Sequence, residues 1–385
     1  MANQRSLALR IGLLYPSTDP LSPSNWSGTP NGLATGMQAQ GIEVVPIPCH
    51  LPLPRRVAVG IRRRLPALGY MTMHRQPGFT RARSLAISEA IASTGRLDGI
   101  LAMGTDLYDL DLAIQGLSIP VATYDDGTFA LFLRYPDSDI SALGLPDREM
   151  RNWVDLQRRA CNAATLACVS TQWAKASIVS DFGLPESRVR VVGMGHRPKR
   201  PPAAPRDYSV PRFLFVGVEW RRKNGAAVLE AFSRIRRQIP DATLAVVGDH
   251  PPIDLPGVTG YGFLPRDVPE AQQLLDRLFI ESTAFVLPSL FDPSPIAYLE
   301  AASAGLPVIA TTCGGAGELL GAAALSVEPH DLDALTAAML RLADGATASR
   351  MGQAALQKSA DSTWQQVSSR IISGLFETAP ARRYA

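Results

Sequence analysis

The most informative part of the sequence is the stretch Leu287-Pro-Ser-Leu-Phe-Asp-Pro-Ser-Pro-Ile-Ala-Tyr-Leu-Glu-Ala-Ala-Ser-Ala-Gly-Leu-Pro-Val308. It starts as the end of a buried strand, passes through a loop rich in proline and serine, and continues as a helix from about Pro295. Proline in the first turn of a helix costs no hydrogen bond, which supports this start. A helix N-terminus that follows the carboxyl end of a strand is a favourable position for a phosphate group. The stretch therefore predicts one strand–loop–helix unit of an α/β sheet, with an anion site at its loop.

Two acidic residues, Asp292 and Glu300, stand eight positions apart in this stretch. The simplest interpretation is that Asp292 caps the helix and that Glu300 lies on a solvated face. Glu300, however, is flanked by Tyr-Leu and Ala-Ala-Ser-Ala, one of the least polar parts of the chain, where a carboxylate needs a partner. Ligand hydroxyls are natural partners, because a carboxylate only accepts hydrogen bonds.

Short apolar runs alternate with amphipathic segments on both sides of this stretch. In the first half we expect strands at 7–15, 42–47, 99–103, 119–123, 167–170 and 189–192, and helices at 31–40, 82–93, 149–163 and 171–182. In the second half we expect strands at 212–216, 243–247, 260–263, 284–287 and 308–311, and helices at 226–238, 269–279, 296–304, 331–342 and 347–360. Strands separated by helices form parallel sheets from βαβ units.

A proline-rich segment separates the two halves, because five of the fifteen residues 197–211 are proline. The length of 385 residues also favours two domains. We expect an N-terminal Rossmann-like domain at 1–205 and a C-terminal Rossmann-like domain at 206–362, each a doubly wound α/β sheet. The last helix, at 363–377, has one apolar face and packs on either domain; on the first, it completes that domain with residues 363–385. Ligands bind at the carboxyl ends of such sheets, so we expect a site in the cleft between them.

The composition excludes several classes of protein. With 46% hydrophobic and 19% charged residues the chain is globular, and no apolar run approaches the roughly 18–20 residues of a membrane span. No small-residue cleavage site follows the short N-terminal apolar run, so we expect a cytoplasmic protein. The four cysteines form no Cys-x-x-Cys pair, which argues against a zinc knuckle or a disulfide framework.

The net charge of +3 is unevenly spread along the chain. No acidic residue occurs between Glu43 and Glu89, but eight arginines do: Arg55, Arg56, Arg62, Arg63, Arg64, Arg75, Arg81 and Arg83. This basic segment has three interpretations: a solvated face, a surface that docks on an anionic membrane, or a site for an anionic acceptor. Nucleic acid is not expected as a partner, because aromatic side chains do not alternate with these arginines.

Taken in order, these motifs resemble the retaining glycosyltransferases of the GT-B fold, specifically glycosyltransferase family 4. The resemblance rests first on the two acids eight positions apart, followed by Glu-Ala-x-x-x-Gly-Leu-Pro-Val and by Gly314-Gly315. Segment 215–225 resembles the Arg-Lys phosphate loop of that family, and 247–249 and 260–264 resemble its nucleotide-binding strand ends. Segments 169–173 and 191–195 resemble the end of its first domain, and 26–30 its N-terminal glycine loop, so that the resemblance covers nearly the whole chain.

The resemblance implies transfer of a sugar, with retention, from a nucleotide-diphosphate donor to a glycan, lipid or small-molecule acceptor. It implies catalytic roles for Arg222, Lys223, Asp292 and Asp126. It places the donor against Gly28, Gly217, Phe263, Leu264, Ser294, Pro295, Ile296, Ala297 and Glu300. In this scheme Glu300 accepts from the ribose hydroxyls and Asp292 from the transferred sugar, while the amides of 294–297 meet the sugar and the distal phosphate.

The charge that develops on a nucleotide-diphosphate leaving group needs neutralising. Arg222 offers a bidentate fork and Lys223 a point charge, so the pair is suited to this task. The alternative is an ordinary solvated basic turn. Because these two cations could neutralise that charge, no metal ion is required, and we expect neither a metal ion nor a cofactor.

The sequence departs from the family pattern at three places. The first acid of the pair is usually glutamate and is here Asp292, which is one methylene shorter, and Asn224 replaces a usual glycine. The strand end that often carries a histidine reads Tyr124-Asp-Asp126; we expect Asp126 to face the cleft, and the alternative is a plain turn with Asp125 as its companion. Two other functions stay open: a catalytically inactive nucleotide-sugar-binding or scaffold protein, and a different GT-B enzyme such as an epimerase or an inverting transferase. A cytoplasmic location with peripheral attachment to the inner face of a membrane fits the basic segment.

Overall fold

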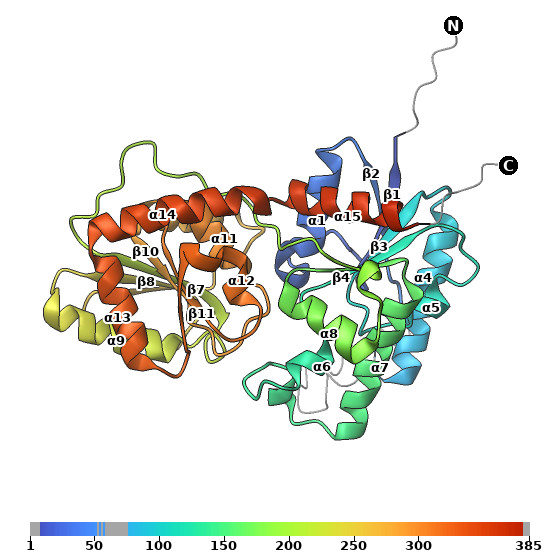
Figure 1. The fold of residues 1–385 in the computed structure, drawn as a ribbon, viewed down its shortest axis with the longest axis horizontal. Coiled ribbons are helices and arrows are strands. Elements are labelled where there is room, and N and C mark those ends of the chain that lie inside the picture. Colours follow the sequence, from blue (N-terminus) through green and yellow to red (C-terminus); the bar gives the residue numbers. More distant parts are fainter. Residues whose placement is uncertain (1–7, 52–53, 55–56, 58–75, 380–385) are drawn as a thin grey trace, which may run out of the picture.

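The computed structural model describes residues 8–51, 54, 57 and 76–379 of the chain. These residues form two six-stranded parallel sheets flanked by helices, one in each half of the sequence (Figure 1). The doubly wound α/β architecture expected from the alternation of apolar runs and amphipathic segments is therefore confirmed.

The N-terminal sheet has the order β2-β1-β3-β4-β5-β6, and every pair in it is parallel. Its strands are β1 (Arg10–Leu14), β2 (Glu43–Ile47), β3 (Gly99–Ala102), β4 (Val121–Asp125), β5 (Leu166–Val169) and β6 (Val189–Val191). The helices around it are α1 (Thr29–Gln38), α4 (Pro77–Ser93), α5 (Leu110–Ala113), α6 (Phe129–Phe132), α7 (Asp147–Ala163) and α8 (Gln172–Phe182), with 3₁₀ turns η1 (Asn25–Gly28), η3 (Ser141–Leu143) and η4 (Glu186–Arg188). Strands β3, β4 and β5 are buried throughout, as a parallel sheet covered on both faces requires.

The C-terminal sheet has the order β12-β11-β10-β7-β8-β9 and is also parallel. Its strands are β7 (Arg212–Glu219), β8 (Thr243–Asp249), β9 (Val258–Gly262), β10 (Ala284–Val286), β11 (Val308–Thr311) and β12 (Ala324–Val327). Its helices are α9 (Gly225–Gln238), α10 (Pro269–Glu281), α11 (Ile296–Ser303), α12 (Ala316–Leu320), α13 (Leu332–Ala343) and α14 (Gly345–Ser359), with turns η5 (Gly321–Ala323) and η6 (Ala360–Ser362). The sequence did not predict β12, α12, α5 or α6, because each has only four or five residues and too few positions to show a period.

The last helix, α15 (Trp364–Thr378), crosses back and packs on α1 of the N-terminal domain (Figure 1). Two glycines of α1 make this approach possible. A Cβ on Gly32 would lie 2.3 Å from the Trp364 ring, and one on Gly36 would lie 2.3 Å from the Trp364 carbonyl oxygen. The apolar face of α15 is then buried through Val367, Ile371 and Leu375. The choice of domain left open by the sequence is thus made by the small residues of α1.

The chain crosses between the two sheets twice, and the two crossings lie side by side. His196, just before the proline-rich linker, pairs as an isolated parallel bridge with Thr363, just before α15. His196 Nδ1 also lies 2.7 Å from the carbonyl oxygen of Ser362, and the His196 side chain is buried. Beyond this point the linker is held against the C-terminal domain, where Arg206 donates to the carbonyl oxygens of Ile280 and Ala304. These paired crossings are the structural hinge between the domains.

Much of the basic segment lies outside the described residues, namely Arg55, Arg56, Arg62, Arg63, Arg64 and Arg75. Of the other two arginines, Arg81 is exposed on α4. Arg83 is only 3% exposed and donates to the carbonyl oxygen of Leu107, so its expected place on a basic surface is wrong. The long stem of Arg83 is buried between α4 and the loop that follows β3, which lets its guanidinium reach that carbonyl. Within the described part of the chain no helix combines the length and the apolar character needed to cross a membrane.

Candidate functional site

The loops that follow β7 and β10 bring Lys223 and Asp292 into direct contact. Lys223 Nζ donates to Asp292 Oδ2, and Ser289 Oγ donates to the same oxygen at 3.1 Å. Asp292 is 4% exposed, and the Lys223 side chain is also largely buried. Both strands end at the same edge of the C-terminal sheet, which is why residues 69 positions apart meet.

Arg222 joins the same two loops from the neighbouring position. Its Nε donates to Glu219 Oε2, and its Nη1 donates to the carbonyl oxygen of Phe291 at 3.1 Å. The same Nη1 lies 3.7 Å from Asp292 Oδ2. In return, the Leu290 amide donates to the carbonyl oxygen of Arg222 at 2.8 Å. The guanidinium is thereby fixed with two anions and one carbonyl around it, and it is not a solvated basic turn.

Burial and charge act in opposite directions on these two cations. Burial lowers the pKa of Lys223, and the Asp292 carboxylate opposes that effect only in part. For Arg222, burial also lowers the pKa, but Asp292 and Glu219 more than offset it, so the pKa is raised. The two cations thus lie beside two carboxylates, those of Asp292 and Glu219, and burial is incompletely compensated only for Lys223.

Gly217 and Asn224 shape the loop that carries these cations. A Cβ on Gly217 would lie 2.8 Å from Lys223 Cγ, so glycine leaves the space that the Lys223 stem occupies. Asn224 has φ 60°, the left-handed region that asparagine enters more readily than other non-glycine residues. Its Nδ2 donates to the carbonyl oxygens of Pro288 and Pro329, at 3.1 and 2.7 Å. Replacement of the usual glycine therefore adds two ties to the loop and keeps a backbone that glycine would also adopt.

The loop before α11 carries an unpartnered buried hydroxyl. Ser294 is 4% exposed, and its Oγ has no hydrogen-bond partner among the residues that the structure describes. The helix begins at Ile296 directly after Pro295, in agreement with the expected start. The Tyr298 amide donates to the carbonyl oxygen of Pro295 at 3.1 Å and is therefore not free to face the loop. This i→i−3 bond tightens the first turn, so the start of the helix has one fewer free backbone N–H group.

The turn Gly314-Gly315 packs closely against the backbone of Asp292. A Cβ on Gly314 would lie 2.2 Å from the Asp292 carbonyl oxygen, and Gly314 has φ 85°. The Ala316 amide donates to the same Asp292 oxygen at 3.2 Å. This close approach explains why two glycines follow the paired acids in the sequence.

Glu300 is 3% exposed, and its partner in the structure is Arg266. Glu300 Oε1 lies 3.5 Å from Arg266 Nη1, which comes from the loop after β9. Phe263 and Leu264 precede Arg266 in that loop, and the Phe263 ring is 53% exposed. Of the predicted donor-binding residues in this loop, Phe263 is exposed and Leu264 is half-buried, and the same loop carries the arginine that contacts buried Glu300.

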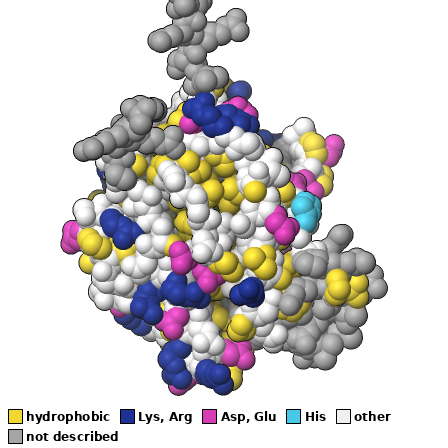
Figure 2. All heavy atoms as spheres, turned by 90° about the vertical axis from the view of Figure 1, so that its right-hand side faces the viewer, with side chains coloured by type: hydrophobic (Ala, Val, Ile, Leu, Met, Phe, Trp, Pro, Cys, Tyr) yellow, Lys and Arg dark blue, Asp and Glu magenta, His cyan; other side chains and the backbone are white. Residues whose placement is uncertain are grey.

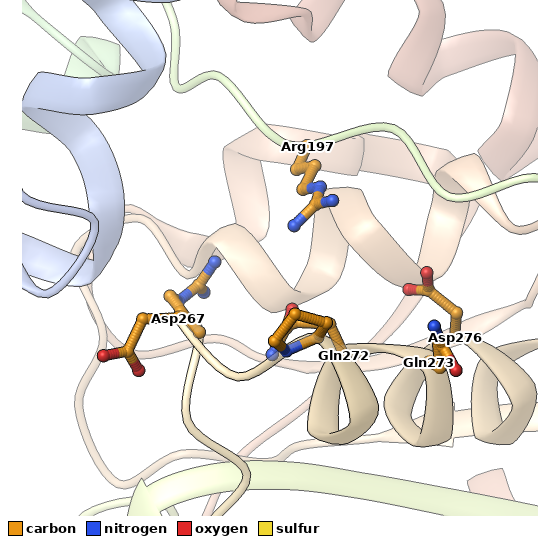
Figure 3. Close-up of a pocket in the computed structure, with 7 residues that line it drawn as sticks. Arg197, Asp267, Gln272, Gln273 and Asp276 are labelled. Carbon is orange, nitrogen blue, oxygen red and sulfur yellow. The ribbon is translucent and has the colours of Figure 1, made fainter.

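A pocket of about 290 Å³ opens beside this ion pair (Figure 3). Its lining comes from the linker, from the loop after β9 and from α10: Arg197, Arg266, Asp267, Pro269, Gln272, Gln273 and Asp276. Figure 3 shows Arg197 reaching down from the linker toward α10, with Gln272 and Asp276 on the opposite side. Arg266 belongs both to the lining of this pocket and to the ion pair with Glu300.

The N-terminal domain contributes two acids at the end of β4. Burial raises the pKa of Asp126 to about 7, and repulsion by Asp292 and Asp139 adds to the effect, while Arg222 opposes it. The pKa of Asp126 therefore depends on the charges of Asp292 and Arg222 in the C-terminal site. Asp125 is 9% exposed, its Oδ2 has no partner among the described residues, and burial together with Asp106 and Asp126 raises its pKa to about 8. Of the two, Asp126 is the more exposed residue.

The predicted glycine loop has an unusual backbone. Trp26, Ser27 and Gly28 are three consecutive residues with positive φ, at 39°, 55° and 86°. A Cβ on Gly28 would meet only the Pro23 carbonyl oxygen, at 3.4 Å, so glycine is needed there for its φ more than for space. The Trp26 ring lies 5.8 Å from the ring of Tyr124 in β4, which places this loop beside the end of that strand. Strained backbone of this kind is concentrated at functional sites.

The structure thus brings Arg222, Lys223 and Asp292 into one cluster, with Ser294 two residues further along the same loop and Glu300 in a second position beside Arg266. Sequence reasoning missed three members of this arrangement: Glu219, Ser289 and Arg266. Each stands alone in a loop or at a strand end, and only tertiary contact links it to the site.

Residues 210–345, which contain the cluster and Glu300, match the family model described as "Glycosyl transferases group 1". The C-terminal domain is a group 1 glycosyltransferase domain. A glycogen synthase of Mycobacterium tuberculosis is 34% identical to this chain over 169 residues, covering 40% of this chain and 39% of that protein. A GDP-mannose-dependent α-(1-6)-phosphatidylinositol monomannoside mannosyltransferase of Mycolicibacterium smegmatis is 32% identical over 162 residues, covering 37% of this chain and 41% of that protein. The match thus spans about two fifths of the length of these curated relatives.

Solved structures resemble the whole chain. A sucrose-phosphate synthase of Thermosynechococcus elongatus superposes with a TM-score of 0.69 at 18% identity, covering 96% of this chain and 99% of that one. An α,α-trehalose-phosphate synthase of Burkholderia vietnamiensis superposes with a TM-score of 0.68 at 14% identity, covering 98% and 99%. The chain as a whole therefore has the two-domain GT-B fold, and the group 1 match lies in its C-terminal half.

Proposed function

We propose that this protein is a glycosyltransferase of family 4 type that moves a sugar from a nucleotide-diphosphate donor to a hydroxyl of a glycan, lipid or small-molecule acceptor. The observation that carries the proposal is the buried cluster of Lys223, Arg222 and Asp292 inside the group 1 domain. Two relatives of this chain are named as users of GDP-mannose and UDP-galactose, which supports a nucleotide-sugar donor.

In this proposal Arg222 and Lys223 bind the diphosphate and stabilise it as it leaves. The bond between the anomeric carbon and the phosphate oxygen breaks, and its electron pair goes to the diphosphate. The acceptor oxygen bonds to the same carbon, and its proton passes to a phosphate oxygen of the leaving group. Attack on the face that the donor phosphate leaves gives retention, and no protein nucleophile is required. The two cations stabilise charge that grows during the reaction, which is the kind of interaction that accelerates it.

We propose that the reaction needs neither a metal ion nor a cofactor, because the two cations supply the charge that a divalent ion would supply. Among the described residues no group of three or more His, Cys, Asp or Glu side chains is placed to hold a metal ion. A stimulation of turnover by Mg²⁺ or Mn²⁺ after treatment with a chelator would contradict this part of the proposal.

In this proposal the two acids of the paired motif bind the donor: Asp292 binds the transferred sugar and Glu300 binds the nucleoside. Asp292 accepts from hydroxyls of the transferred sugar while it keeps Lys223 as its counter-ion. Ser294 Oγ and the amides of Ile296 and Ala297 meet the sugar and the distal phosphate, which gives the unpartnered hydroxyl a role. Glu300 accepts from the ribose hydroxyls in place of its long contact with Arg266, and the nucleoside lies beside Phe263, Leu264 and Gly217. Asp126 and the loop at Gly28 approach the sugar from the N-terminal domain.

The acceptor class is proposed from relatives and from charge. Two relatives are named for lipid-linked acceptors, a phosphatidylinositol monomannoside and a diphosphoundecaprenol, so a sugar or lipid-linked acceptor fits. On the described part of the face in Figure 2, Lys and Arg side chains lie next to Asp and Glu side chains. We therefore propose that attachment to the inner face of a membrane uses the arginines outside the described residues.

Thermal-shift titration with UDP-glucose, GDP-mannose and ADP-glucose tests the donor. A ligand that binds only the folded state raises stability by about 2.7 kcal/mol at a hundredfold excess over its dissociation constant. We expect one base to raise Tm, and the same nucleotide sugar to be slowly hydrolysed by the wild-type protein but not by Lys223→Ala. Absence of any shift and any hydrolysis would refute the proposal, and a shift without hydrolysis or transfer would favour the inactive sugar-nucleotide-binding protein.

A further inference from the structure

A phenylalanine of the C-terminal site loop is buried in the other domain. Phe291, which directly precedes Asp292, is 1% exposed. Its ring centroid lies 5.4 Å from that of Phe132, 4.9 Å from that of Tyr135 and 5.9 Å from that of Trp173. All three partners belong to the α6–α8 region of the N-terminal domain. Trp173 Nε1 donates to the Tyr135 hydroxyl at 3.1 Å, which holds two walls of this aromatic socket together.

A glutamate of the C-terminal domain caps a helix of the N-terminal domain. Glu318 on α12 accepts from the Gln172 amide through Oε2 at 2.7 Å and from the Trp173 amide through Oε1 at 2.9 Å. These are the first two residues of α8, whose own cap residue, Thr171, accepts only from the Ala174 amide. A carboxylate at this position satisfies two free N–H groups and interacts favourably with the helix dipole.

Both contacts exist only when the two domains are closed. They lie at facing edges of the domains, with α12 opposite α8 (Figure 1), while the paired chain crossings at His196 and Thr363 form the hinge. In an open molecule the Glu318 carboxylate, Gln172 N and Trp173 N turn to water, and the Phe291 ring loses its socket. The apolar burial of an aromatic ring and a charge-assisted pair of hydrogen bonds are therefore available to hold the closed state.

We infer that Glu318 and Phe291 form an interdomain latch, and that Glu318 is a positioning residue for the reaction. The second part rests on the proposed glycosyltransferase function. The Phe291 carbonyl oxygen accepts from Arg222 Nη1, and Asp292 is the next residue. Closing the latch thus sets the loop that holds Arg222 and Asp292, at the moment when Asp126 is brought close enough to sense the Asp292 charge. The latch couples domain closure to assembly of the site.

Small-angle X-ray scattering of the full chain without ligand tests the latch directly. We expect the wild-type protein to scatter as the closed structure, and Glu318→Ala to show a larger radius of gyration and maximum dimension. Glu318→Gln keeps the side chain's length and one acceptor oxygen, so we expect an intermediate value. The matched control is Asp344→Ala, which removes a helix cap within the C-terminal domain, where Asp344 Oδ2 accepts from the Thr347 amide at 2.9 Å. The control should lower Tm without changing the radius of gyration.

A variant in the opposite domain tests the same contact independently of how α12 folds. Gln172 is the first residue of α8, where proline is tolerated, and Thr171 before it is extended, as a residue before proline prefers. Gln172→Pro removes the N–H that Glu318 Oε2 accepts and leaves the helix intact. Because the Trp173 amide still donates to Glu318, we expect it to open the molecule partly, as Glu318→Gln does, and to add little when combined with Glu318→Ala.

Salt gives a readout that a merely structural residue would not change. Because the Glu318 contact is charge-assisted and exposed, we expect 0.5 M NaCl to enlarge the wild-type protein and to have little effect on Glu318→Ala. If the wild-type and the Glu318→Ala proteins have the same dimensions at low salt, the latch is refuted. This result does not depend on any catalytic activity, so it is separate from a failure of the proposed function.

The positioning role is tested with the nucleotide sugar identified by the thermal-shift titration. We expect Glu318→Ala to lower kcat for donor hydrolysis and transfer at least fivefold, with a smaller change in donor dissociation constant, because the donor binds mainly to the C-terminal domain. Glu318→Gln should recover part of kcat. If the molecule opens but kcat is unchanged, the latch stands and the positioning role is wrong.

Discussion

At the residue scale, the contact between Lys223 and Asp292 is the interaction whose loss is expected to change the free energy of unfolding most. Both side chains are largely buried, so removal of one partner leaves the other charge without compensation. Breaking such a pair costs about 3–5 kcal/mol of the free energy of unfolding, whereas replacing both partners is often nearly neutral.

We therefore predict that Lys223→Met lowers stability by about 3 kcal/mol and that Lys223→Met/Asp292→Asn recovers most of the loss. Neither variant should recover donor hydrolysis, because both lack the cation that stabilises the diphosphate. Urea unfolding of the four proteins of the cycle, with hydrolysis assays alongside, measures both effects. A double variant with normal turnover would mean that the pair serves stability alone.

Substitution of Glu300 is predicted to weaken nucleotide binding with little effect on stability. In Glu300→Gln the side chain keeps its shape and loses only a long, partly exposed ion pair with Arg266, so Tm should change little. Donor affinity should fall by roughly tenfold, because a hydrogen bond to a charged acceptor is worth about 1.5–3 kcal/mol. Calorimetric titration with the donor measures this change, and Arg266→Gln shows whether loss of the pair alone has the same effect. If Glu300→Gln unfolds while its folded fraction binds donor normally, Glu300 is structural.

Asp126 is predicted to make stability depend on pH. Its pKa of about 7 in the folded state lies above that of an unfolded aspartate, near 4. Between these values the folded state holds a proton that the unfolded state has lost, so the contribution of Asp126 to the free energy of unfolding falls as pH rises from about 4 to about 7.

Asp126→Asn has no carboxyl group at this position and so does not lose stability in this way as pH rises. We therefore expect the Tm of Asp126→Asn, relative to that of the wild type, to rise between pH 4.5 and pH 7.5. Melting curves at half-unit steps of pH measure the difference. Asp254→Asn, a change of the same chemistry on an exposed loop, is the control and should show no such trend. An Asp126→Asn difference that is flat with pH would mean that Asp126 is ionised throughout this range.

At the scale of elements, the loop η1 and the start of α1 are held by a left-handed backbone. Gly28→Val forces a β-branched residue to φ 86°, whereas Gly28→Asn introduces a side chain that tolerates that region. If this loop lines the cleft, Gly28→Val should leave nucleotide binding nearly intact and abolish sugar transfer, because the nucleotide belongs to the C-terminal domain. Gly28→Asn separates the effect of φ from that of an added side chain. Normal transfer by Gly28→Val would show that the loop lies away from the active cleft.

At the scale of the whole molecule, the basic segment between Arg55 and Arg83 is the remaining candidate for a membrane contact. Arg83 is removed from it by burial, and Arg81 is the exposed arginine among the described residues of the segment. If the segment binds anionic lipid, each arginine close to the surface contributes about 1 kcal/mol, and the binding weakens with salt. We expect the full chain to sediment with phosphatidylserine-containing vesicles at 50 mM NaCl and less so at 500 mM. Equal sedimentation with neutral phosphatidylcholine vesicles would contradict the membrane interpretation.

Much of this architecture could be predicted because it depends on local patterns. Apolar runs and amphipathic periods placed the long helices and the central strands within a few residues; the helix after Pro295 and the strand at Val308–Thr311 are examples. Very short elements such as α12 escaped prediction, yet α12 carries Glu318 and so contributes one half of the proposed latch.

The sequence alone specifies two α/β domains, a linker and the acids and cations of the candidate site, since periodicity and motif spacing are properties of neighbours along the chain. The partners of those residues are set by the tertiary structure. The pairs Lys223 with Asp292 and Glu300 with Arg266 join loops from different βα units, and Phe291 and Glu318 reach into the other domain. Such contacts depend on which strand ends share an edge of a sheet and on how two sheets face each other. Packing across the whole chain decides both, and no local period records it.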